Sequence, residues 1–332
     1  MKQFIFGILA ITLISIVACS DNEFDREVVI PQFNFPKTVV FEDSLSSYSI
    51  FKGNQSDLLP ADDFHLLELG SVLFSNYSYK QRLVKVPQGS QIDRLDDGSI
   101  EFPNGTLLTK TFYYFNNEQN TSLGKRIIET RLLIKQSDIW NVATYIWNEE
   151  QTDAMLELDG LQTQVNWIDS NGENISILYQ VPTENECTTC HQSNSSMTPL
   201  GTKLRNLNRL VDRNGITVNQ LAHLQSVGIL SDFPLIEIPT IEDYPNTTAS
   251  LNNRARAYLE MNCAHCHNPN AWQEPARQDL DLRYEIALDQ TGIIEKSDDI
   301  MRSVIEGEMP FIGTTVLDKE GANLIVEYIE SL

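Results

Sequence analysis

The feature that most constrains this chain is a five-residue pattern, Cys-x-x-Cys-His, that occurs twice. It stands at residues 187–191 and again at residues 263–267. In each copy two thiols three residues apart lie on one side of a short helical turn, where they can add to the two vinyl groups of a haem. The histidine that follows projects under the ring and binds the iron as proximal ligand. The sequence therefore predicts two covalently bound haem c groups, attached at Cys187, Cys190, Cys263 and Cys266, with His191 and His267 as iron ligands.

Four cysteines also allow two other interpretations, a zinc site and a pair of disulfides. Zinc-binding cysteine pairs usually lie about 15–20 residues apart, whereas Cys190 and Cys263 are separated by 73 residues. Disulfides do not require a histidine after each pair. Covalent haem is the interpretation that explains all four cysteines and both histidines.

The chain downstream of the second motif resembles class I cytochrome c. Residues 251–262 predict a helix leading into the motif, and residues 318–332 predict a closing helix with one apolar face. Between them, Met309 precedes Pro310 in a loop 42 residues after His267, which is long enough to pass around the ring. The resemblance implies that Met309 is the distal ligand of the second iron. The alternative is a methionine that fills the core.

The first motif has no equivalent Met-Pro loop, because residues 198–260 contain no methionine. Met197 follows His191 too closely to pass easily around the ring edge. His223 has ample reach, but it points away from the apolar stripe of an expected helix at 217–228 and could be a surface residue. Met261 and an open iron site are further options. His265 is expected to be exposed, and His65 is expected to be structural.

The amino terminus has the pattern of an export signal. Residues 4–18 are mostly apolar and uncharged, too short to span a bilayer comfortably, and they end in Ile-Val-Ala before Cys19. This resembles a bacterial lipobox, which implies that Cys19 is lipidated and becomes the first mature residue; the alternative is an ordinary secretory signal. We therefore expect a lipoprotein of the bacterial cell envelope, anchored in the outer membrane and facing the periplasm or the cell surface.

The first half of the chain has the period-two pattern of strands rather than the period of helices. Residues 140–147 are apolar on both faces, as in an interior strand. Turn signals stand at Asp97-Gly98, Asn104-Gly105 and Asn171-Gly172. A half-buried strand is indicated where Ile128, Thr130, Leu132 and Ile134 alternate with Glu129, Arg131 and Leu133. After residue 182 helices and loops are expected, including a helix at 217–228 that opens with a capping box at Thr217.

These patterns predict the fold class and the domains. We expect an antiparallel β-sandwich-like N-terminal domain followed by mostly helical cytochrome c-like haem domains. The expected divisions are a lipoprotein signal peptide (1–18), a tether (19–37), a β-rich domain (38–182), a first haem-binding segment (183–250) and a class I cytochrome c-like domain (251–332).

Beyond the haem motifs, the chain resembles a family of exported dihaem c-type cytochromes with a β-rich N-terminal region. The resemblance covers most of residues 40–332 and implies two covalent haems without deciding the reaction. Its matching pieces are Pro103-Asn104-Gly105-Thr106 with Lys110-Thr111-Phe112, Glu129-Thr130-Arg131-Leu132-Leu133, Tyr145-Ile146-Trp147-Asn148, and Arg254-Ala255-Arg256-Ala257-Tyr258-Leu259 running into Asn262-Cys263-Ala264-His265-Cys266-His267.

The net charge of the chain indicates which kinds of macromolecule it can bind. Acidic residues outnumber basic ones 46 to 24, a net charge of −22, which repels nucleic acid and attracts a basic protein. We expect a lipid-anchored carrier that transfers electrons to or from a redox partner protein. The alternatives are a dihaem enzyme, peroxidase-like or reducing another small molecule at an open first haem, and a haem subunit that docks on a partner oxidoreductase.

Overall fold

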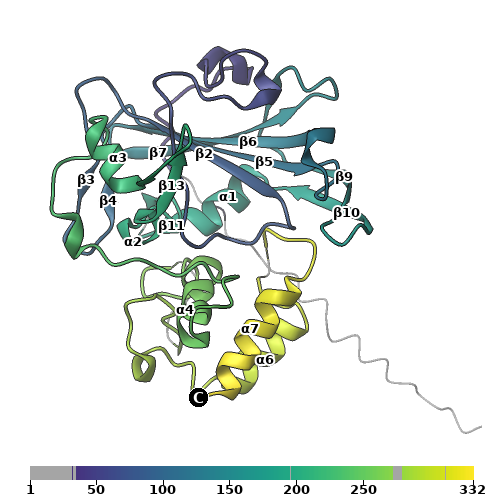
Figure 1. Ribbon diagram of the computed structural model, residues 1–332, viewed down its shortest axis with the longest axis vertical. Helices are drawn as coiled ribbons and strands as arrows, with labels where there is room; N and C mark the ends of the chain where they lie inside the picture. Colours follow the sequence, from purple (N-terminus) through teal and green to yellow (C-terminus); the bar gives the residue numbers. More distant parts are fainter. Residues whose placement is uncertain (1–31, 33–34, 195, 272–278, 311) are drawn as a thin grey trace, which may run out of the picture.

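The computed structural model describes residue 32 and residues 35–194, 196–271, 279–310 and 312–332. A six-stranded antiparallel sheet with the order β1-β2-β5-β6-β7-β8 is its largest sheet among the described residues and lies in the upper part of the view in Figure 1. Consecutive strands of the run from β5 to β8 pair with one another, so this part of the sheet is a meander. The strands are β1 (His65–Leu66), β2 (Tyr79–Lys85), β5 (Leu107–Phe115), β6 (Lys125–Gln136), β7 (Ile139–Trp147) and β8 (Ala154–Glu157).

Both faces of this sheet are covered, but not by a second large sheet. Alternate residues of each strand point to opposite faces: Leu132 joins one apolar cluster with Leu45 and Phe51, from the segment that precedes β1. Leu133 joins another cluster with Cys187 and Met261, from the segments that carry the two motifs. The hairpin of β9 (Leu161–Ile168) and β10 (Asn174–Val181) packs separately against Tyr114 and Ile128. The motif-bearing segments thus lie on one defined face, which we call the cavity face.

Residues 183–250 alternate short helices with small hairpins. The helices are α1 (Glu184–His191), α2 (Leu204–Leu207) and α3 (Gln220–Ser226), and the hairpins pair β11 (Gln192–Ser193) with β12 (Ser196–Met197) and β13 (Leu210–Arg213) with β14 (Ile216–Asn219). The expected helix at 217–228 is shorter than predicted. Thr217 belongs to β14, and the side chain of Asn219 caps α3 by accepting a hydrogen bond from the Ala222 amide. Alternating apolar residues in 216–219 favour the hairpin over another helical turn.

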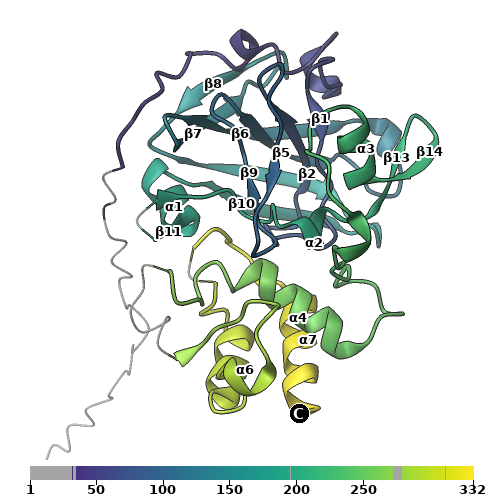
Figure 2. The ribbon, with the colours of Figure 1, turned by 90° about the vertical axis from the view of Figure 1, so that its left-hand side faces the viewer.

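The C-terminal segment contains three described helices below the sheet (Figure 2). They are α4 (Leu251–Asn262), α6 (Ser297–Ile305) and α7 (Lys319–Glu330). Ser250 caps α4 and Asp318 caps α7, so the two helices predicted around the second motif are confirmed within two residues. Tyr258 and Leu259 of α4 pack against Leu324 and Tyr328 of α7. Leu332, expected on the apolar face, is 52% exposed.

The predicted fold class is wrong, although the first half of the chain does form antiparallel β-structure. The N-terminal region is not a β-sandwich, because one sheet is covered by loops, helices and a hairpin, and the β9–β10 hairpin is too small to form an opposing layer. The segments that carry the two motifs are not mostly helical cytochrome c-like domains. Residues 183–250 contain helices of eight residues or fewer beside two hairpins, and the described residues between α4 and α6 are mostly turns, bends and irregular chain with one 3-10 helix. The molecule is β-rich.

Cys19, the signal peptide and most of the tether lie outside the described residues. Two smaller strands, β3 (Asp93–Arg94) and β4 (Ile100–Glu101), pair across the turn predicted at Asp97-Gly98. The described part of the chain contains no helix long and apolar enough to cross a membrane.

Candidate functional site

The first motif lies on α1, whose start is fixed by its own sequence. The Thr183 side chain accepts a hydrogen bond from the Glu186 amide (3.2 Å), and the Glu186 carboxylate accepts one from the Thr183 amide (2.7 Å). This capping box begins the helix at Glu184, three residues before Cys187. The helix keeps Cys187 and Cys190 one turn apart and ends at His191.

The ring of His191 is oriented by a backbone hydrogen bond. Its Nδ1 lies 2.8 Å from the carbonyl oxygen of Thr198, so Nδ1 carries the proton and donates. The lone pair is then on Nε2, which is the usual arrangement for a histidine that ligates iron through Nε2. Burial lowers the pKa of His191 to about 4, so the ring is neutral and able to bind a metal.

The second motif follows the end of α4. The amides of Cys266 and His267 both donate to the carbonyl oxygen of Cys263, at 3.0 and 2.9 Å, which continues the chain as a helical turn. The Asn262 side chain accepts a hydrogen bond from the Phe74 amide (2.7 Å), in the connection between β1 and β2. The second motif is therefore attached to the edge of the sheet domain as well as to α4.

The two motifs open onto one cavity of about 650 Å³, within the usual range for small-molecule and cofactor pockets. Its lining includes all four cysteines of the motifs, His191 and His267. The Cys190 thiol interacts directly with the Cys266 thiol and with the His265 ring. Segments that are 73 residues apart in the chain thus meet at their motifs.

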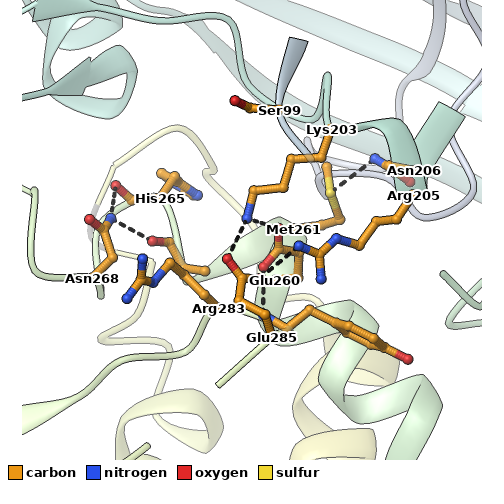
Figure 3. Close-up of polar contacts among 12 residues, drawn as sticks. Ser99, Lys203, Arg205, Asn206, Glu260, Met261, His265, Asn268, Arg283 and Glu285 are labelled. Carbon is orange, nitrogen blue, oxygen red and sulfur yellow. Dashed lines mark hydrogen bonds and ion pairs between the residues drawn. The ribbon is translucent and has the colours of Figure 1, made fainter. Parts of the chain in front are cut away.

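A polar network fixes the two motif-bearing segments to each other (Figure 3). Lys203, just before α2, forms ion pairs with Glu260 of α4 (2.7 Å) and with Glu285 (3.4 Å). Arg205 of α2 also binds Glu285, at 2.9 Å. Glu260 is 8% exposed and Arg205 12%, whereas Lys203 and Glu285 are 31% and 40% exposed, so the network is only partly shielded from solvent.

Of the residues considered as distal ligands, some line the cavity and others do not. Met309 lines the cavity and its side chain is 38% exposed. Met261 lines it too, but its sulfur accepts a hydrogen bond from the Asn206 amide group at 3.2 Å. Met197 lies in the core beside the sheet and does not line the cavity. His223 is half-buried on α3, near His65 and Arg213, and does not line the cavity either.

One histidine is placed differently from the expectation. His265, predicted to be exposed, is half-buried and lines the cavity. The prediction assumed that the positions between the two cysteines face solvent, but packing of the motifs against each other covers them. In the first motif, Thr188 and Thr189 are also buried, and both hydroxyls donate to the carbonyl oxygen of Asn185.

The sheet supplies cavity residues that the sequence analysis missed. Arg82, Lys110 and Arg131 line the cavity from β2, β5 and β6. Residues 129 and 131 were assigned to the solvent side of a half-buried strand, yet Glu129 is fully buried. The signal that could have revealed them is that each of three strands carries a charged residue at a position that pairs with a charged residue of its neighbour. Analysis of the period-two pattern within one strand does not detect such pairs.

Three of the motif thiols have a raised pKa in their present surroundings. Burial raises the pKa of Cys187 to about 11 and that of Cys263 to about 12. The contact with Cys266, followed by burial, raises the pKa of Cys190. All four motif cysteines are free thiols, so the disulfide alternative is not realised here.

The cavity residues fit a haem c group. Both motifs present two cysteines and a histidine to one cavity, and the Thr198 hydrogen bond leaves the ligating nitrogen of His191 without a proton. The described residues include no group of three or more His, Cys, Asp or Glu side chains arranged to hold a metal ion. Haem iron needs a different arrangement, because the porphyrin supplies four of its ligands and the chain supplies only the axial ones.

Comparison of the chain with protein-family models, curated proteins and solved structures finds no match. The functional interpretation therefore rests on the motifs and on the geometry of the cavity.

Proposed function

We propose that this protein is a dihaem c-type cytochrome that transfers electrons. The observation that carries the proposal is the shared cavity, where two complete Cys-x-x-Cys-His motifs from distant segments meet. A zinc or disulfide role would not need both histidines or a cavity of this size. Bound haem supplies an iron that changes between its ferrous and ferric states one electron at a time.

The residues of the chain would have the following roles in binding the two haems. Cys187 and Cys190 hold one haem, and Cys263 and Cys266 hold the other. His191 and His267 are the proximal ligands, and Met309 is the distal ligand of the second iron. The apolar walls that Leu67, Leu108 and Leu133 contribute exclude water from the cavity and so help to set its redox properties.

The interaction of Cys190 with Cys266 bears on how electrons would move. Groups attached at these two thiols share one cavity, so an electron can pass between them without leaving the protein. The acidic net charge of −22 favours a basic redox partner, and the lipobox at Cys19 supports a membrane-anchored protein of the bacterial envelope.

A second candidate, a small-molecule reductase with an open first haem, is favoured by the positions of two residues. His223 lies outside the cavity, and the Met261 sulfur is engaged by Asn206. If the first iron lacks a protein distal ligand, the wild-type protein binds carbon monoxide or cyanide rapidly at one haem. A carrier with two saturated irons does not.

The deciding experiment is to count haems. The full chain is produced with a cytochrome c maturation system, and the mature protein is weighed intact by mass spectrometry. The expected result is a mass increase of two haems, falling to one haem in a Cys187→Ala/Cys190→Ala variant and to one in a Cys263→Ala/Cys266→Ala variant. Zinc content is measured in the same samples.

Wild-type protein that carries one haem, none, or stoichiometric zinc contradicts the proposal. As a control for folding, a Ser122→Ala variant, altered on an exposed loop of the sheet domain, retains both haems.

A further inference from the structure

Three cations stand side by side across the cavity face of the sheet. The strand register places Arg82 of β2 directly opposite Lys110 of β5, and Lys110 directly opposite Arg131 of β6. Neighbouring strands are about 4.8 Å apart, and like charges placed directly opposite each other destabilise a sheet. All three residues line the cavity. We call them the cation row.

The row has only one carboxylate partner within the described part of the chain. Glu129 binds the guanidinium of Arg131 through both oxygens, at 2.9 and 2.5 Å, and also accepts a hydrogen bond from the Tyr179 hydroxyl at 2.7 Å. Arg82 and Lys110 have no ion pair or side-chain hydrogen bond to any described residue. The Lys110 Nζ and the Arg131 Cζ lie 4.8 and 4.5 Å from the centre of the Phe112 ring. These cation–π contacts offset the cost of burying the two positive charges only partly.

The other carboxylates of the cavity wall are engaged elsewhere. Glu186 completes the capping box of α1, and Asp318 caps α7 and accepts from the Tyr258 hydroxyl. Glu308 binds Arg302 and Ser303, and Glu306 lies 4.0 Å from Arg302. The remaining titratable groups that face or adjoin the row are Lys80, Tyr179, His191, His265, His267 and the four motif cysteines. Two cations of the row therefore remain unneutralised.

This excess charge is costly where it stands. Burial, and then the positive charges of Arg82, Lys80 and Arg131, lower the pKa of Lys110 well below its ordinary range. Burial lowers the pKa of Arg82 to about 10. Concentrating unpaired cations in one internal wall is unfavourable unless an anion occupies the space beside them.

We propose that the cation row is an oxyanion-binding site whose occupants are the propionate carboxylates of haem attached at the first motif. The inference rests on the proposed function. The row is close to that motif, because the row, Cys187 and His191 line the same cavity and Leu133, two residues after Arg131 on β6, packs in one cluster with Cys187. A tethered carboxylate is present at a far higher effective concentration than a free ion. Arginine and lysine side chains are suited to bind it.

The test uses the haem-loaded full-length protein. Lys110→Met and Arg82→Gln each remove one charge of the row while keeping similar side-chain volume, and Lys110→Arg retains the charge. Arg126→Gln is the matched control, because Arg126 lies on β6 outside the cavity, where its guanidinium contacts only the Gln164 carbonyl oxygen (3.3 Å) and the exposed Glu149 carboxylate (3.5 Å) among the described residues. Haem content is measured first, followed by the reduction potentials of both haems from pH 5 to pH 8.

If the proposal is right, Lys110→Met and Arg82→Gln retain two haems but lower the potential of one. Loss of a nearby positive charge disfavours the reduced form, and it raises the propionate pKa, so this potential becomes more dependent on pH. Lys110→Arg restores the wild-type behaviour, and Arg126→Gln changes neither potential.

Three results separate the possibilities. Normal haem content with potentials that match the Arg126→Gln control overturns the role of the row and leaves the proposed function intact. Inorganic phosphate that shifts a wild-type potential, but not that of Lys110→Met, assigns the row to a free oxyanion and overturns its assignment to the propionates. A wild-type protein without haem overturns both proposals.

Discussion

At the scale of single residues, different contacts position the two motifs around their histidines, His191 and His267. His191 donates from Nδ1 to the Thr198 carbonyl, which comes from the β11–β12 hairpin directly after the motif. The carbonyl oxygen of His267 accepts a hydrogen bond from the Leu282 amide, fifteen residues further along the chain. The first ring is thus oriented by a local hairpin, whereas the second motif is positioned by a more distant loop.

Met309→Ala should affect one iron only. Because a thioether ligand favours reduced iron, its loss should lower the potential of the second haem and open that iron to carbon monoxide. Redox titration and carbon monoxide binding check this, with Met155→Ala as control, since Met155 is 53% exposed on edge strand β8. An unchanged spectrum with both potentials unaltered would show that Met309 is not a ligand.

The motif cysteines and histidines and Met309, which residue types and spacing singled out, all line the cavity. Residue types and spacing were not enough to find Arg82, Lys110 and Arg131. A period-two pattern shows which residues share a face of a strand, but a cavity of mixed polarity makes one face carry both Leu133 and Arg131. What covers that face depends on chain segments far away in the sequence.

At the scale of elements, the pair of helices around the second motif depends on a very close approach. Gly321, in the first turn of α7, lies against the ring of Tyr258 on α4, where a Cβ atom would overlap the ring. The Tyr258 hydroxyl donates to Asp318, the residue that caps α7. The Tyr258 side chain therefore contacts α7 twice: its ring packs against Gly321, and its hydroxyl binds the capping residue at the start of the helix.

Gly321→Ala should destabilise the protein in spite of helix propensity. Alanine gains about 1 kcal/mol over glycine inside a helix, but overpacking of this kind costs about 1–3 kcal/mol. The expected net result is a lower midpoint in urea unfolding of the haem-loaded chain. Glu320→Ala, an exposed neighbour on the same helix, should leave the midpoint nearly unchanged. A midpoint that rises in Gly321→Ala would mean that the two helices can separate at no cost.

Long elements were easier to predict than short ones. The helices at 251–262 and 318–332 and the strand at 140–147 have clear periodicity and caps, and the structure confirms them. The segment 183–250 was harder, because helices of four to eight residues and strands of two to four residues contain too few periods to be told apart. The Thr183 capping box was a readable signal that was overlooked.

At the scale of the whole molecule, the lipobox predicts a membrane-bound protein. Wild-type protein should partition into detergent and incorporate labelled fatty acid, and Cys19→Ser should do neither, since the lipid would be lost. Cys187→Ser is a suitable comparison, because it removes a cysteine without touching the anchor. Detergent partitioning that persists in Cys19→Ser would point to a different attachment.

Burial of Cys187 has a consequence for how the protein is made. Its side chain is 5% exposed and packs in one cluster with Leu133 and Val142 of the sheet. An attachment enzyme cannot reach this thiol once α1 has docked on the strands. Under the proposed function, biosynthesis must follow a fixed order: export comes first, ligation of the cofactor to the still-open polypeptide second, and closure against the sheet last.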